Sequence, residues 1–184
     1  MSQLKSSILQ PFSYSVPDLF ILSIRFGRKR TKITMTVLGD IVNTRNIPET
    51  YTILNKLLPQ IFLSKCFNDD RLTFKTEVQR TEIGHLFEHI LLEYLCDYKF
   101  SKGYKDVVFT GVTNWNWKKD PYGTFHIRVN SAQDDIDIFQ KALERTISLV
   151  SLIMTNNKAL PLPEVLRPAL FSDASLPALR KLSI

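Results

Sequence analysis

The sequence predicts an α+β domain: a sheet of four or five strands, antiparallel or mixed, covered on one face by about three helices. Two pairs of segments rich in β-branched and aromatic residues are each joined by a loop with turn-forming residues. Three other segments repeat apolar residues every three or four positions, which is the spacing of a helix with one buried face. With 184 residues and 44% hydrophobic content, the chain can build one sizeable core.

The first half of the domain is expected to begin with a β-hairpin. Its strands are Leu19 to Phe26 and Thr31 to Leu38, joined by a turn that contains Gly27. A helix is predicted over Glu49 to Phe62, where apolar residues recur at helical spacing and Pro59 either ends the helix early or kinks it.

The second half is expected to alternate strands with two long helices. A short strand is predicted over Leu72 to Val78, and Thr81 can cap the helix that follows it. Strands are predicted over Asp106 to Thr113 and Thr124 to Val129, and a long amphipathic helix over Asp134 to Met154.

Outside the domain, assigned to residues 19–155, both ends of the chain are expected to be extensions. Residues 1–18 form an expected N-terminal arm without the apolar stretch of a secretion signal. Residues 156–184 form a tail broken by prolines, with a short helix expected near Leu176 to Leu182. No segment is apolar enough to span a bilayer, so no membrane contact is expected.

The cysteine content indicates the cellular compartment of the protein, and the charge bears on its binding partners. Two cysteines are too few for a disulfide framework, which indicates reduced thiols and a cytoplasmic protein. The net charge is +6, and five basic residues flank the turn at Gly27. No nucleic-acid-binding motif accompanies them, so a solvated turn is the better interpretation and nucleic acid is not an expected partner. The five are Arg25, Arg28, Lys29, Arg30 and Lys32.

The segment after Thr81 contains the strongest functional signal, an HxxEH motif formed by His85, Glu88 and His89. On a helix the two histidines lie one turn apart on one face, where both imidazoles can reach a single zinc ion. Glu88 could then accept a proton from a metal-bound water. Gly84 lies inside the first turn, where a glycine indicates close approach by a neighbouring element.

A hydrolytic zinc site usually needs a third protein ligand. His126, on a predicted strand, is the first candidate, and Glu77 and Cys96 are further ones. Glu93, four residues after His89, is predicted to hydrogen-bond the histidine nitrogen that does not face the metal. The alternative is that the histidines bind no metal and pair only with nearby glutamates.

A loop with two tryptophans offers a candidate substrate-binding wall. Trp115 and Trp117 are separated by one residue and should point to the same side of an extended chain. Together with Asn114 they either line a substrate groove or pack over an edge of the core.

The motif and the order of elements resemble the N-terminal domain of cyanophycin synthetase over about residues 19–154. A segment containing Pro59 and followed by Cys66 is similar as well. The resemblance implies a small α+β module, without the family's ATP-dependent domains, that binds an Asp-Arg polymer and in some members cuts it as a metallopeptidase. The matching residues of the motif are Gly84, His85, Glu88, His89, Leu92 and Glu93.

Two functions therefore follow from the sequence. The first is a zinc-dependent hydrolase of peptide or isopeptide bonds, favoured by the complete HxxEH motif. The second is a non-catalytic module for a polymer, peptide or protein partner. It is favoured by two departures from the family, which commonly has an arginine where this chain reads Thr113-Asn114-Trp115 and an acidic residue where it reads Ile127-Arg128-Val129-Asn130.

Overall fold

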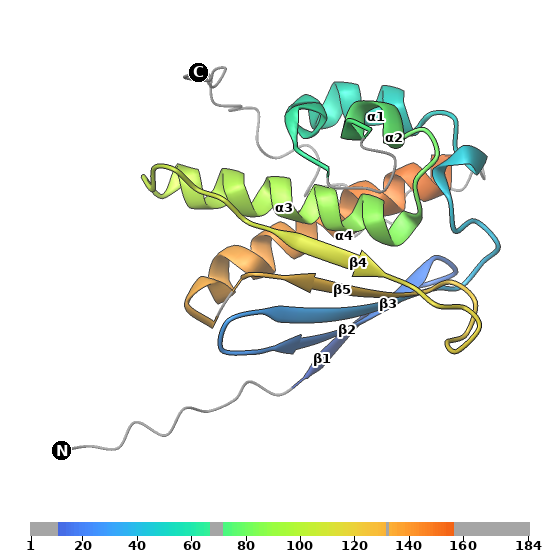
Figure 1. Ribbon diagram of the computed structural model, residues 1–184, viewed down its shortest axis with the longest axis horizontal. Helices are drawn as coiled ribbons and strands as arrows, with labels where there is room; N and C mark the ends of the chain where they lie inside the picture. Colours follow the sequence, from blue (N-terminus) through green and yellow to red (C-terminus); the bar gives the residue numbers. More distant parts are fainter. Residues whose placement is uncertain (1–10, 67–71, 132, 157–184) are drawn as a thin grey trace.

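The core of the protein is a five-stranded sheet in which every neighbouring pair of strands is antiparallel (Figure 1). The computed structural model describes residues 11–66, 72–131 and 133–156, so the helix expected near Leu176 lies outside the described residues. The predicted α+β class and strand number are confirmed. The strands, in their order across the sheet, are β1 (Phe12–Val16), β2 (Phe20–Phe26), β3 (Thr31–Val37), β5 (Thr124–Val129) and β4 (Gly111–Asn114).

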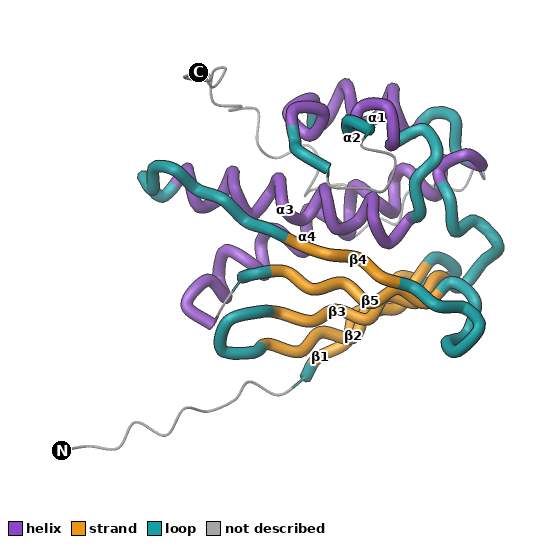
Figure 2. Tube along the Cα trace, in the orientation of Figure 1, coloured by secondary structure: helices purple, strands orange, loops and turns teal. Residues whose placement is uncertain are grey.

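The helices form two layers on one side of this sheet. The two long helices α3 and α4 pack against each other, and α3 contacts β4 and β5. Figure 1 shows α1 and α2 on the side of α3 away from the sheet, and Figure 2 shows the same separation of helices and strands. The helices are η1 (Thr44–Asn46), α1 (Thr50–Leu57), η2 (Pro59–Leu63), α2 (Phe74–Glu77), α3 (Ile83–Ser101), η3 (Gln133–Asp135) and α4 (Ile136–Asn156).

Because α3 lies between the sheet and this outer layer, its N-terminal half is buried on nearly all sides. Residues 86–91 are all buried, including the polar Glu88 and His89. A helix in this position needs apolar residues around most of its circumference. The polar residues of its motif are therefore held inside the protein.

Several local predictions differ from the structure. The strand predicted over Leu72 to Val78 is wrong, because these residues contain the single helical turn α2. The helix predicted over Glu49 to Phe62 ends at Leu57, and Pro59 opens the 3-10 helix η2 instead. This outcome agrees with the early end considered for that proline.

Two strand predictions and one cap also need correction. The strand expected from Asp106 is confined to Gly111–Asn114. Strand β1 lies in the stretch predicted as an N-terminal arm, and it pairs with β2. The N-cap of α3 is Glu82, which makes no side-chain capping bond. Thr81 Oγ1 instead lies 2.8 Å from Nδ1 of His85.

Among the described residues, no helix covers the other face of the sheet (Figure 1), which carries a row of basic residues. Arg25 pairs with Lys32 across β2 and β3, and Lys32 pairs with Arg128 across β3 and β5. All three side chains are exposed. Within the described residues, no helix has both the length and the apolar character needed to cross a bilayer.

Candidate metal centre

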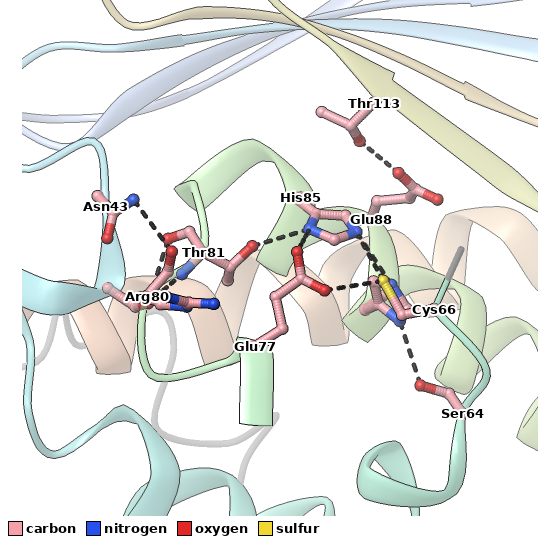
Figure 3. A network of polar contacts seen from close by, with 11 residues as sticks. Asn43, Ser64, Cys66, Glu77, Arg80, Thr81, His85, Glu88 and Thr113 are labelled. Atoms are coloured by element: carbon pink, nitrogen blue, oxygen red, sulfur yellow. Dashed lines mark hydrogen bonds and ion pairs between the residues drawn. The ribbon is translucent and has the colours of Figure 1, made fainter. Parts of the chain in front are cut away.

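The polar residues near the start of α3 point in two directions. The His85 and His89 imidazoles face the outer layer, where the Phe74 ring stacks on His89 with centroids 3.9 Å apart. The Glu88 carboxylate faces β4 and accepts a hydrogen bond from Thr113 Oγ1 (Figure 3). The helix thus places the two histidines side by side, as predicted, but directs the Glu88 carboxylate to a different side.

A cysteine completes the histidine pair. Nε2 of His85 lies 3.1 Å from Nε2 of His89 and 3.5 Å from Sγ of Cys66. The donor atoms of the three residues all lie within 4.8 Å of one another. We refer to Cys66, His85 and His89 as the Cys-His-His cluster.

The distances inside the Cys-His-His cluster match those around a zinc ion. Tetrahedral zinc with bonds of about 2.05 Å to nitrogen and about 2.3 Å to sulfur places two nitrogens about 3.3 Å apart, and a nitrogen and a sulfur about 3.6 Å apart. The observed separations are 3.1 Å between the two nitrogens and 3.5 Å between His85 Nε2 and Cys66 Sγ. Two of the three donor–donor distances therefore match those around a single zinc ion, and the third, between Cys66 and His89, is no longer than 4.8 Å.

The other nitrogen of each imidazole has a partner that orients the ring. Nδ1 of His85 lies 2.8 Å from Thr81 Oγ1 and 3.8 Å from a Glu77 oxygen. Nδ1 of His89 lies 3.2 Å from Ser64 Oγ. Such partners fix the ring and direct Nε2 toward a metal.

Glu77, a candidate ligand, occupies a supporting position. Its Oε2 accepts a hydrogen bond from Cys66 Sγ over 3.2 Å, while its Oε1 faces His85 (Figure 3). A cysteine binds metal as the thiolate, so its proton must leave when a metal binds. Glu77 is placed to receive that proton.

Burial keeps both histidines in the form that can bind a metal. It lowers the pKa of His89 to about 3, and the neighbouring His85 contributes in the same direction. Burial also lowers the pKa of His85, against an opposing attraction from Glu77. Since metal binding requires neutral imidazole, neither ring must lose a proton near pH 7.

Burial has the opposite effect on Glu88, because it disfavours the charged carboxylate. It raises the pKa of Glu88 to about 7, while the hydrogen bond from Thr113 lowers it. The side chain is only 4% exposed. A carboxyl group with this pKa can exchange a proton near neutral pH, as a general base must.

Two glycines allow α3 to lie this close to the sheet. A Cβ on Gly84 would lie 2.3 Å from Cγ of Phe125, so the close approach predicted at this position is present. A Cβ on Gly111 would lie 2.6 Å from Oε1 of Glu88. Any larger residue at either position would push the helix or the carboxylate away.

The cluster opens into a cavity of about 1010 Å³. Residues 63–66 line one part of it and residues 107–115 another, and α3 contributes His85, Glu88 and His89. The volume is at the upper end of the range for ligand-binding pockets. The candidate metal ligands therefore line a space that a substrate can enter.

His126, predicted as the third ligand, is not part of the cluster. It lies on β5 between the buried residues Phe125 and Ile127, and its Nε2 is 3.2 Å from Asp120 Oδ2. Phe125 packs against α3 at Gly84. Because successive side chains of a strand alternate between faces, His126 points to the opposite face of the sheet. Cys66, and not His126, is the third member of the cluster.

The remaining candidates on α3 line the same cavity. Glu93 and Cys96 both contribute to its wall, outside the Cys-His-His cluster. The nitrogen of His89 for which Glu93 was the predicted partner lies beside Ser64.

The predicted substrate-binding residues divide between the cavity and the core. Asn114 and Trp115 line the cavity. Trp117 donates a hydrogen bond from its ring nitrogen to the carbonyl oxygen of Thr124, and its ring packs edge-on against Phe125. Trp117 thus packs over an edge of the core, which was one of the two alternatives considered.

Cys66 was not among the predicted ligands. It lies 19 residues before His85, and only the fold brings the two together. Its chemistry was the available signal, since thiolate and imidazole are the commonest zinc ligands and the chain has only two cysteines.

No family is assigned by comparison. Neither a protein-family model nor a curated protein matches this chain.

Proposed function

We propose that this chain is a zinc-dependent hydrolase of peptide or isopeptide bonds. The observation that carries the proposal is the arrangement of the Cys66, His85 and His89 donor atoms, all within 4.8 Å of one another at the wall of a large cavity. Three protein ligands leave one of four tetrahedral positions for water or substrate, which is the pattern of catalytic zinc sites. Structural zinc sites usually fill all four positions with protein ligands.

The chemistry follows from the residues around the cluster. When bound, zinc would polarise a substrate carbonyl and make a bound water more acidic. Glu88 lies on the same helix and lines the same cavity, although its carboxylate is turned toward β4, and it is the residue that we propose accepts a proton. The Thr113 hydroxyl holds its carboxylate by a hydrogen bond. Thr81 and Ser64 keep the imidazoles in orientation.

The proposal agrees with the resemblance to the N-terminal domain of cyanophycin synthetase, which implies cleavage of an Asp-Arg polymer. Peptides and Asp-Arg-type polymers are therefore the substrate class that we propose to test first. The expected family arginine is absent at Thr113-Asn114-Trp115, so the substrate contacts at this wall must differ from those of the family.

A second candidate function, a non-catalytic binding module, is favoured by one observation. The polar atoms of the cluster already have protein partners: Cys66 donates to Glu77, and the two histidine Nε2 atoms face each other. The network thus closes without a metal. In that case the cavity would bind a polymer, peptide or protein partner without cutting it.

Metal content of variant proteins distinguishes these functions. We would measure zinc by mass spectrometry in protein purified without a histidine tag, comparing the natural chain with Cys66→Ser and with a His85→Ala, His89→Ala double variant. Cys96→Ser is the matched control, because Cys96 lines the same cavity outside the cluster. The proposal expects about one zinc per chain in the natural protein and in the control, and a large loss in the other two.

Activity is then tested with Glu88→Gln. This variant should keep its zinc and lose hydrolysis of peptide and isopeptide substrates, since glutamine cannot accept the proton. Absence of zinc from the natural chain even after zinc is supplied would refute the hydrolase and leave the binding module. Full activity in Glu88→Gln would refute the assigned base.

A further inference from the structure

Strand β4 is an edge of the sheet whose outer side has no partner strand among the described residues. Its residues Gly111–Asn114 are mostly exposed, and none is charged or a proline. Natural proteins usually protect an open edge with charges, prolines or bulges, because unpaired main-chain groups attract another strand. The edge of β4 lacks charges and prolines.

The register of β4 and β5 shows which main-chain groups are unpaired. The amide of Asn130 donates to the carbonyl oxygen of Thr110, and the amide of Thr110 donates to the Asn130 side chain. In an antiparallel ladder, hydrogen-bonded pairs alternate with non-hydrogen-bonded pairs. The main-chain groups of Val112 and Asn114 therefore also face β5. Those of Gly111 and Thr113 face away from it.

The outward side of β4 runs along the cavity of the candidate metal centre. Nine consecutive residues, 107–115, line this cavity, as do residues 63–66 and the Cys-His-His cluster. A new strand would lie about 4.8 Å from β4, the spacing between strands in a sheet. Such a strand would run through the cavity whose wall the Cys-His-His cluster helps to form.

We infer that the cavity binds a peptide segment in extended conformation, as a sixth strand hydrogen-bonded to the main chain of Gly111 and Thr113. The inference rests on the proposed function, for which it names the substrate class and the mode of binding. Addition of a strand to an open edge is a general way to hold a peptide, because the main-chain bonds are the same for every sequence. It would also present main-chain carbonyls in a regular row along the cluster.

The charge of the cavity wall indicates which side chains such a peptide should carry. Among the described residues, four glutamates line the wall, Glu77, Glu82, Glu88 and Glu93, against one lysine, Lys65. Cationic side chains therefore complement it better than anionic ones. A suitable probe is an octapeptide of alternating threonine and lysine with blocked ends, compared with the same peptide carrying glutamate in place of lysine.

The inference is tested by amide hydrogen exchange of the natural chain, measured by nuclear magnetic resonance without added zinc. With saturating threonine-lysine peptide, the amides of Gly111 and Thr113 should exchange about tenfold more slowly or better, because they gain partners. The amides of Val112 and Asn114, already directed at β5, are internal controls and should change little. Methylation of all peptide nitrogens should weaken binding by about tenfold or more, as several hydrogen bonds are lost.

Unchanged exchange at Gly111 and Thr113, equal slowing of all four amides, or no binding of either octapeptide would each overturn the inference. Because zinc is left out, the result is separate from the test of the hydrolase. A chain that never binds zinc would refute the proposed function and could still show the alternating pattern. A chain that binds zinc but shows unchanged amides would refute only the inference.

Discussion

Replacement of Glu88 by glutamine should stabilise the metal-free protein at alkaline pH. Burial raises the pKa of Glu88 from 4.5 to about 7. Between these values the folded state binds the proton more tightly than the unfolded state, so stability falls as the pH rises and the loss is complete above pH 7. At about 1.36 kcal/mol per pH unit, this difference in the pKa of Glu88 between the unfolded and folded states corresponds to about 3 kcal/mol. Glutamine keeps an oxygen that can accept the Thr113 hydrogen bond, but it does not ionise.

The assay is urea denaturation of both proteins from pH 4.5 to pH 8 in the presence of a chelator. The difference in free energy of unfolding, variant minus natural chain, should rise by about 3 kcal/mol over this range. Glu49→Gln removes the same charge from an exposed position at the start of α1 and is the control. A difference that does not depend on pH, or that falls as the pH rises, would refute the account of Glu88.

Four further outcomes are expected. Ser64→Ala should weaken zinc binding about tenfold in a chelator competition, through loss of its contact with Nδ1 of His89; equal affinities would show that this contact does not matter. Gly84→Ala should lower the free energy of unfolding by about 2–3 kcal/mol, because its methyl group would overlap the Phe125 ring, and Gly103→Ala, in open space at positive φ, by only about 1 kcal/mol. Equal urea midpoints would contradict that contrast. In the Glu88→Gln protein without metal, stability should fall as the pH drops below 6.5, with a slope that approaches about 1.4 kcal/mol per pH unit. The reason is that His89, with its pKa lowered to about 3, stays neutral only in the folded state; a flat profile to pH 4.5 would disprove this. Free zinc at 100 times its dissociation constant should stabilise the natural chain by about 2.7 kcal/mol, reversibly with chelator, and an unchanged melting temperature would argue against a folded-state site.

The elements predicted correctly are those whose signal is local. The hairpin of β2 and β3, the motif helix α3 and the long helix α4 each repeat apolar residues at the period of their own structure. The turn α2 was predicted as a strand because only four residues form it, too few for a helical period to be visible. The ring of Phe74, the first residue of α2, stacks on His89, and no local sequence pattern reveals such a contact between distant segments.

The same distinction applies to the site. His85 and His89 could be paired from the sequence, because one helical turn fixes their separation. The third member required knowledge of the tertiary structure. Cys66 reaches the pair from the outer layer, whereas His126 is excluded by the face of β5 to which it belongs. Which face a strand residue occupies depends on pairing with β3 and β4, and a shift of one residue would reverse it.

The position of Cys66 gives a bound metal a mechanical role. Cys66 belongs to the segment 63–66 that forms one wall of the cavity, and both histidines belong to α3. A metal held by all three would connect the wall to the helix and so close the chain between Cys66 and His85, which are 19 positions apart. Occupancy of the metal and the width of the entrance would then be thermodynamically linked. Any molecule that binds more tightly to the cavity when the metal is bound must, by reciprocity, raise the affinity of the cluster for the metal.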